Sequence, residues 1–143
     1  KEMAVTSALT TRLVVLGMLL LTSLGLSACG ESASARPSNA TDQGAALVRE
    51  FGCLTCHAVS KSETGQKLGP MLAGLYGAPV RLADGREVTA DDAYVRQSIL
   101  QPDAATVEGY SAGVMAAGIE RHKARIAAGG TVDALLAYIK SLE

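Results

Sequence analysis

Hydrophobic and polar positions follow three patterns along the chain, and each predicts a different kind of segment. Residues 13–26 form an almost unbroken apolar run, LVVLGMLLLTSLGL. Residues 29–42 have no apolar periodicity and are rich in Ser, Ala and Asn, which is typical of a flexible tether. Over residues 43–143 apolar side chains recur at helical spacing, which predicts one globular domain.

The apolar run has the length of the hydrophobic segment of a signal peptide. A helix that crosses a bilayer needs about 20 apolar residues, whereas this run has about 14. It ends in the sequence LSAC, where small residues precede Cys29 as they do in a bacterial lipobox. We therefore expect residues 1–28 to be a lipoprotein signal peptide and Cys29 to carry acyl chains. A retained anchor helix is the alternative.

Both interpretations place the domain at the same location. The protein is expected to be exported and anchored at a membrane, facing the periplasm or the outer side of the cytoplasmic membrane. Several long acyl chains on Cys29 would hold it there stably, because each buried methylene contributes about 0.8 kcal/mol.

A first amphipathic segment begins near residue 41. Thr41 or Asp42 can cap its first turn, and we expect the helix to end near Gly52. Its apolar surface comes from Ala45, Leu47, Val48 and Phe51.

A second amphipathic segment, TVDALLAYIKSL, lies at the other end of the domain. Leu135, Ile139 and Leu142 are spaced as one face of a helix, and Thr131 can cap it. We expect the first and last helices to cross and to close the fold.

The middle of the domain carries the signals of a hairpin followed by a helix. The Asp-Gly pair at 84–85 is a favoured two-residue turn because both residues tolerate a positive φ, so we expect a short hairpin near residues 80–88. Thr89 and Asp92 have the spacing of a capping box at a helix start. Pro102 would end that helix.

Composition and charge reduce the number of possible functions. The formal net charge is −1 and basic residues are not clustered, which argues against nucleic-acid binding. Aromatic residues make up 3% of the chain, with one Phe and no Trp, so the aliphatic core is thin for a domain of this size. A buried prosthetic group would complete such a core.

Residues 53–57, CLTCH, carry the strongest chemical signal in the chain. Cys53 and Cys56 lie three residues apart, so both thiols fall on one face of a helical turn. Each thiol can add to one vinyl group on the same edge of a porphyrin, and His57 follows where its imidazole can reach the iron. The motif predicts one covalently bound haem c with His57 as an iron ligand.

Three other interpretations fit this motif less well. A structural zinc site needs four ligands, and only Cys29 and His122 remain to complete it. A thioredoxin-like dithiol needs a strand–helix–strand setting, which the surrounding pattern does not provide. Simple burial of two thiols leaves the adjacent His57 without a role. With one thiol for lipid and two for haem, all three cysteines are accounted for.

With these motifs, residues 42–143 resemble the class I cytochromes c. The middle is most similar to the cytochrome c domain fused to subunit II of some bacterial haem–copper oxidases. In that branch an LADG hairpin precedes a helix that ends in Ile-Leu-x-Pro, and these stand here at 82–85 and 99–102. The remaining likeness rests on CLTCH, on Gly69-Pro70 with Leu72, on GLYG at 74–77 and on LAYIK at 136–140.

The resemblance implies an all-α fold of three to five helices around one covalently bound haem, with a short hairpin near residues 80–88. It also implies that the carbonyl of Pro70 accepts the Nδ1 proton of His57, which fixes the tautomer and strengthens the ligand. Met71, which follows Pro70, is expected to pack in the core.

The second axial ligand has more than one candidate. In the family a methionine from a later loop completes the coordination, and Met115 lies where that ligand falls. The family has Met-Pro there, whereas Met115 is followed by Ala116. His122 is the competitor, although its basic neighbours predict a solvated helix face. An open or water-ligated position is the third alternative.

These features predict an electron-transfer protein rather than an enzyme. An iron with two protein ligands has no open position for substrate, so it exchanges single electrons at the haem edge. The expected partners are a terminal oxidase or a quinol-oxidising complex of a respiratory or photosynthetic membrane. The alternatives are a fixed haem subunit of a larger complex and a haem-based gas or redox sensor with a labile sixth ligand.

Overall fold

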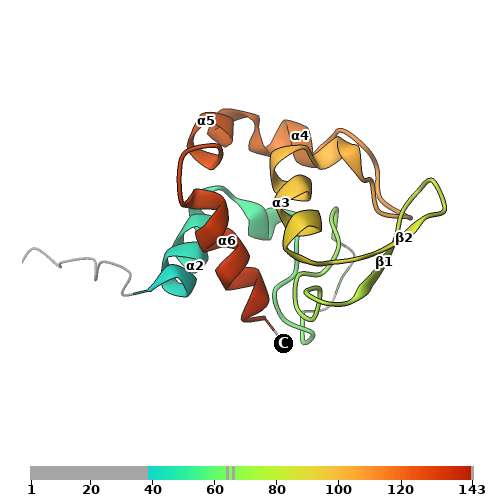
Figure 1. Cartoon of the computed structure of the whole chain (residues 1–143), viewed down its shortest axis with the longest axis horizontal. Helices are drawn as coiled ribbons and strands as arrows, with labels where there is room; N and C mark the ends of the chain where they lie inside the picture. The colour runs from blue at the N-terminus through green and yellow to red at the C-terminus, as the bar shows by residue number, and fades with distance from the viewer. Residues whose placement is uncertain (1–38, 64, 66, 143) are drawn as a thin grey trace, which may run out of the picture. The chain divides into compact units, whose positions relative to one another are not determined.

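Short helices and one two-stranded hairpin make up the part of the chain that the computed structural model describes, residues 39–63, 65 and 67–142. The predicted signal peptide, Cys29 and most of the predicted tether lie outside these residues. No helix within them is both long and apolar enough to cross a bilayer. The elements are α2 (Ala40–Glu50), η1 (Cys53–Thr55), β1 (Pro79–Arg81), β2 (Glu87–Thr89), α3 (Asp92–Leu100), η2 (Pro102–Ala104), α4 (Val114–Ile119), η3 (Glu120–His122), α5 (Lys123–Ile126) and α6 (Thr131–Lys140) (Figure 1).

Asn39, rather than Thr41 or Asp42, caps α2. Its side-chain oxygen accepts a hydrogen bond from the backbone N–H of Asp42 at 2.9 Å. The helix therefore begins inside the predicted tether, and the expected cap was wrong because an earlier amide side chain reaches this N–H. The expected end is confirmed, since α2 stops at Glu50 and Gly52 takes a left-handed φ of 72°.

The predicted crossing of the first and last helices is confirmed. α2 and α6 lie side by side (Figure 1). At their closest approach, a Cβ on Gly44 would overlap the carbonyl oxygen of Ala134 and would lie 2.6 Å from the Cβ of Tyr138. Only glycine allows the backbones to come this close. The buried side chains at this crossing are Leu47, Val48 and Phe51 from α2 with the adjoining turn, and Val132, Leu135, Leu136 and Ile139 from α6.

The start of α6 differs from the prediction. Gly130 occupies the N-cap position with a φ of 81° and no side-chain cap, and Thr131 is the first helical residue. The glycine turn sets the start of the helix, so the hydroxyl of Thr131 lies one position too late to cap it. Leu135 and Ile139 are buried as expected, and Leu142 lies just beyond the helix and is half-buried.

The hairpin near residues 80–88 is confirmed, but its turn is not the predicted two-residue one. β1 and β2 pair antiparallel with Val80 opposite Val88. The N–H of Gly85 donates to the carbonyl of Leu82 at 2.9 Å, and Gly85 alone takes a positive φ, of 85°. The carboxylate of Asp84 accepts the N–H of Arg86 at 3.0 Å instead of entering the left-handed region. The result is a three-residue loop that ends in a left-handed glycine.

Asp91 caps α3, so the predicted capping box of Thr89 and Asp92 was wrong. The side chain of Asp91 accepts a hydrogen bond from the N–H of Tyr94 at 2.9 Å. A carboxylate one residue before the helix is better placed for this N–H than a threonine two residues further back. The helix ends before Pro102, as expected.

Polar contacts on the surface join α3 to α6. Arg96 pairs with Asp133 at 2.5 Å, and Lys140 pairs with Asp92 at 2.6 Å. The hydroxyl of Tyr76 also donates to Asp92 at 2.5 Å. Each exposed pair contributes little alone, but together they fix α3 relative to the crossed helices. The apolar side of α3 is thereby held toward the centre of the fold.

Candidate functional site

A cleft with a mainly apolar lining lies between α3, α4 and the crossed helices. It encloses about 1130 Å³ not filled by protein atoms, counting the part open to solvent. Cys53, Cys56, His57, Pro70 and Met115 all belong to its lining. The structure thus brings together on one cleft the residues that the sequence assigned to a cofactor.

A single helical turn presents the two cysteines. The chain leaves α2 through the left-handed Gly52 and enters η1. The N–H groups of Cys56 and His57 both donate to the carbonyl of Cys53, at 3.1 and 2.9 Å. Burial raises the pKa of the Cys53 thiol, which keeps it protonated at neutral pH. The expected helical arrangement of the motif is confirmed.

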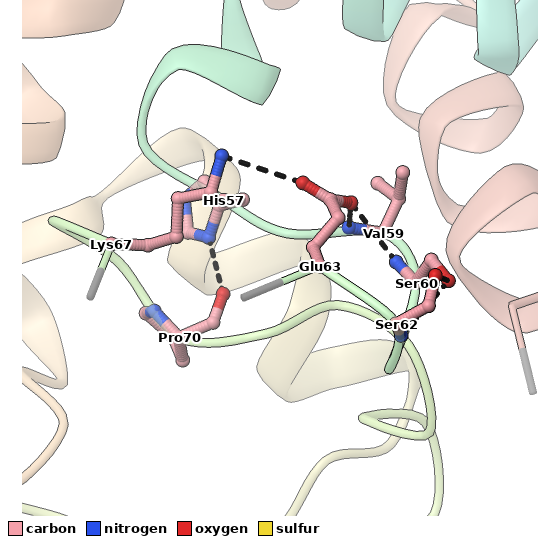
Figure 2. Close-up of polar contacts among 7 residues, drawn as sticks. All are labelled: His57, Val59, Ser60, Ser62, Glu63, Lys67 and Pro70. Carbon is pink, nitrogen blue, oxygen red and sulfur yellow. Dashed lines mark hydrogen bonds and ion pairs between the residues drawn. The ribbon is translucent and has the colours of Figure 1, made fainter. Parts of the chain in front are cut away.

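His57 is held in one orientation by the backbone of Pro70 (Figure 2). Its Nδ1 lies 2.7 Å from the carbonyl oxygen of Pro70, as the sequence predicted. A carbonyl can only accept, so Nδ1 carries the proton and Nε2 keeps its lone pair. Burial lowers the pKa of His57, outweighing the opposing effect of the Pro70 hydrogen bond, and so favours the neutral ring. A neutral imidazole with a fixed tautomer is the form that binds a metal ion.

Gly69 makes room for the His57 ring. A Cβ at residue 69 would lie 2.5 Å from Cε1 and 2.9 Å from Nδ1 of that ring. The N–H of Gly69 also donates to the carbonyl of Cys56 at 2.9 Å, which returns the loop to the motif. The sequence pointed to Gly69 only through the resemblance and gave no reason for a glycine there. Close packing of imidazole on backbone is that reason.

Glu63 braces the loop between His57 and Pro70. One carboxylate oxygen accepts the N–H groups of Val59 and Ser60, at 2.8 and 3.1 Å, and the other lies 3.4 Å from the Lys67 ammonium (Figure 2). The Val59 hydrogen bond is the main cause of the lowered pKa of Glu63. Sequence reasoning missed this residue, although the S-x-x-E spacing from Ser60 was a signal for it.

Replacing Gly69 by Ala is expected to displace the His57 ring and to lower the free energy of unfolding by about 1–3 kcal/mol, since the added methyl overpacks the contact. Urea denaturation of the full chain measures this. Gly118→Ala is the matched control: Gly118 lies in α4 with open space around it, so alanine there is expected to be neutral or mildly stabilising. Equal stabilities of the two variants would contradict the role of Gly69.

Met115 reaches the cleft from the first turn of α4. It is half-buried and packs against the core. A proline at residue 116 would steer the residue before it away from helical φ and ψ, whereas Ala116 lets Met115 be helical. The departure from Met-Pro noted in the sequence therefore changes the local backbone.

Met71 does not pack in the core as predicted. Its exposed fraction is 38%, whereas Leu72 is buried at 8%. The N–H of Leu72 donates to the carbonyl of Ala58 at 2.8 Å, which holds the backbone at this point. Leu72 takes the inner position, which turns Met71 toward solvent.

His122 lies apart from the described cleft lining. Its ring packs against Phe51 with centroids 4.9 Å apart. The guanidinium of Arg125 lies over the Phe51 ring, 5.3 Å from its centroid, and pairs with Glu50. Arg121, Lys123 and Arg125 are exposed, as the predicted basic face requires, but His122 itself is half-buried. Its aromatic neighbour accounts for this difference.

Comparisons with protein-family models and with curated protein sequences find no match for this chain. Within the described residues, no group of three or more His, Cys, Asp or Glu side chains is placed to hold a metal ion. The lining of the cleft includes the thiols of Cys53 and Cys56, the imidazole of His57 and the thioether of Met115.

Proposed function

We propose that this protein is a single-electron carrier that holds one haem c through thioether bonds to Cys53 and Cys56. His57 would ligate the iron on one side and Met115 on the other. The observation that supports this most is that the two thiols, the oriented imidazole and the methionine thioether line a single apolar cleft.

The cleft residues suit such a group in two further respects. The lining is mainly aliphatic and aromatic, which matches the apolar faces of a porphyrin. The hydroxyls of Ser98 and Tyr94, both of which belong to the lining, interact with each other at its edge and leave the rest of the wall apolar.

Different residues of this chain would have different roles in electron transfer. When bound, the haem supplies an Fe(III)/Fe(II) couple. Pro70 holds the proton on His57 Nδ1 and so keeps Nε2 available to the iron. The thioether of Met115 would be a soft, neutral ligand that favours the reduced metal, and the apolar lining would limit the access of water to it. The redox couple would thus lie at high potential.

We further propose that Cys29 is lipidated and anchors the domain to a membrane. The domain would face the periplasm or the outer side of the cytoplasmic membrane. A tethered carrier would exchange electrons with membrane complexes such as a terminal oxidase or a quinol-oxidising complex. Encounters between such redox proteins use small, short-lived interfaces.

Expression of the full chain in a bacterium that attaches haem c to exported proteins tests the proposal. The expected product carries one haem that survives acid denaturation, seen as added mass, and its visible spectrum changes reversibly with a one-electron reductant. A chain that is exported and folded but carries no covalent haem would refute the proposal.

The Met115→Ala variant is expected to lose the thioether-to-iron absorption band of the oxidised protein and to bind carbon monoxide when reduced. Its potential should fall by on the order of 0.1–0.2 V, within the roughly 0.8 V that axial ligands span. His122→Ala should leave all three properties unchanged, because that ring packs on Phe51. If the unsubstituted protein lacks that band and only His122→Ala gains carbon monoxide binding when reduced, the ligand role passes to His122.

A further inference from the structure

The helix that carries Met115 lacks a cap of its own. α4 has six residues, and its N-cap is Gly113, with a φ of 79° and no side-chain cap. A helix this short is not stable by itself in water. The position of Met115 therefore depends on contacts that hold the start of α4 from outside the helix.

Asp103 provides such a contact. Its Oδ1 accepts the backbone N–H of Gly113, the N-cap residue, at 2.7 Å, so a carboxylate from η2 takes the role that the N3 side chain has in a capping box. A hydrogen bond from an amide to a charged carboxylate is stronger than one between neutral groups. Asp103 follows α3 after two residues and lines the cleft, which links the start of α4 to the cleft wall.

The segment between Asp103 and Gly113 is tied to the hairpin. Ala83 donates its N–H to the carbonyl of Thr106 at 2.9 Å, and Glu108 donates its N–H to the carbonyl of Arg81 at 2.9 Å. The side chains of Arg81 and Glu108 also pair, at 3.3 Å. The part of the loop before residue 109 is thus held by β1 and its turn.

Residues 111–113 then carry the chain away from this anchored part toward Met115. Tyr110 closes a last turn by donating its N–H to the carbonyl of Val107 at 3.1 Å. The side-chain bond from Asp103 to Gly113 closes the loop at its far end, two residues before Met115.

We propose that Asp103 is a positioning residue for Met115: by capping α4 at Gly113, its carboxylate holds the methionine thioether over the cleft. This inference rests on the proposed function, because the thioether matters only if it ligates an iron. Asp103 acts through the backbone of α4 and not on the iron itself. Its loss should therefore free the sixth position without disturbing Cys53, Cys56 or His57.

The test compares Asp103→Ala with the full-length, haem-loaded protein. Carbon monoxide binding to the reduced form reports how often the thioether leaves the iron, and we expect that population to rise about five- to thirty-fold. The thioether-to-iron band of the oxidised form should weaken in parallel, while the mass of covalent haem stays unchanged.

Two further variants separate positioning from general stability. Asp103→Asn keeps an oxygen that can accept the Gly113 N–H and is expected to restore most of the band. Asp42→Ala is the control, because Asp42 is an exposed aspartate in the first turn of α2, outside the hairpin and the loop that lead to α4. It should leave both the band and carbon monoxide binding as they are.

Each outcome decides the matter. If Asp103→Ala keeps its haem, band and carbon monoxide response, the positioning role is overturned while the proposed function stands. A loss of stability without any change in ligation overturns it too, since that is the effect of a cap alone. If the unsubstituted chain carries no haem, the proposed function fails and the inference fails with it. Should Asp103→Ala not fold, amide exchange at Gly113 in the unsubstituted protein decides, and fast exchange overturns the proposal.

Discussion

Replacing both Cys53 and Cys56 by serine is expected to reduce covalent haem from one per chain to none. Serine hydroxyls do not add to vinyl groups under the conditions in which thiols do, so no thioether can form. His57 and Met115 would remain, but two axial ligands hold a haem only reversibly. Mass spectrometry of the acid-denatured protein measures the change directly.

The same double variant is expected to lose much of its stability. The proposed covalent haem could not dissociate, so it would cover the cleft lining in every folded molecule. Without that group the apolar lining between α3, α4 and the crossed helices would be exposed to water, or the cleft would collapse. We expect the free energy of unfolding to fall by about 5 kcal/mol or more, as for the largest cavity-forming changes.

Cys29→Ser is the control for this experiment, because Cys29 is the one cysteine of the sequence that lies outside the CLTCH motif. It should leave haem content and stability unchanged and instead release the protein from the membrane fraction. A double serine variant that still holds haem after acid denaturation would contradict the assignment of the attachment site. Loss of haem in Cys29→Ser would contradict the division of the thiols between lipid and haem.

Gly44→Val is expected to destabilise the fold by about 4 kcal/mol or more, and Gly44→Ala by about 3 kcal/mol. Even the first side-chain atom at this position overlaps the carbonyl oxygen of Ala134. That atom belongs to the backbone of α6 and cannot rotate away, so the two helices must separate. Separation exposes the apolar face that they bury together.

Urea denaturation of haem-loaded proteins tests the effect of Gly44. Gly129→Ala is the matched control, since a Cβ at residue 129 meets nothing within 4 Å. It should change the free energy of unfolding by no more than about 0.5 kcal/mol. A Gly44→Ala protein that unfolds at the same urea concentration as the control would show that the crossing tolerates a wider spacing.

The sequence predicted correctly those features that follow from the local spacing of residues. The spacing of Cys53, Cys56 and His57 determines a helical turn, and the apolar periodicity of the end segments determines which faces cross. The Asp-Gly pair located the hairpin for the same reason. The sequence analysis did not single out Gly44, although it stands one turn before Leu47 and Val48 on the same apolar stripe.

Predictions of the helix caps were wrong where several side chains could bond to the same backbone N–H group. Asn39 and Asp91 cap their helices although Thr41 and Thr89 are chemically suitable, because only the geometry shows which oxygen reaches the free N–H. Nothing in the sequence relates Asp103 to Gly113, since the loop between them is shaped by the hairpin. If Met115 is the sixth ligand as proposed, its position would depend on such a distant contact, which the sequence does not show.

The crossing of α2 with α6 also bears on the order of events during biogenesis. The two helices come from opposite ends of the domain, so the apolar stripe of α2 stays uncovered until α6 has been synthesised. Throughout that interval the neighbouring CLTCH turn belongs to an open chain. A haem-attaching enzyme would then meet both thiols unhindered, and docking of the final helix would seal the finished bonds inside.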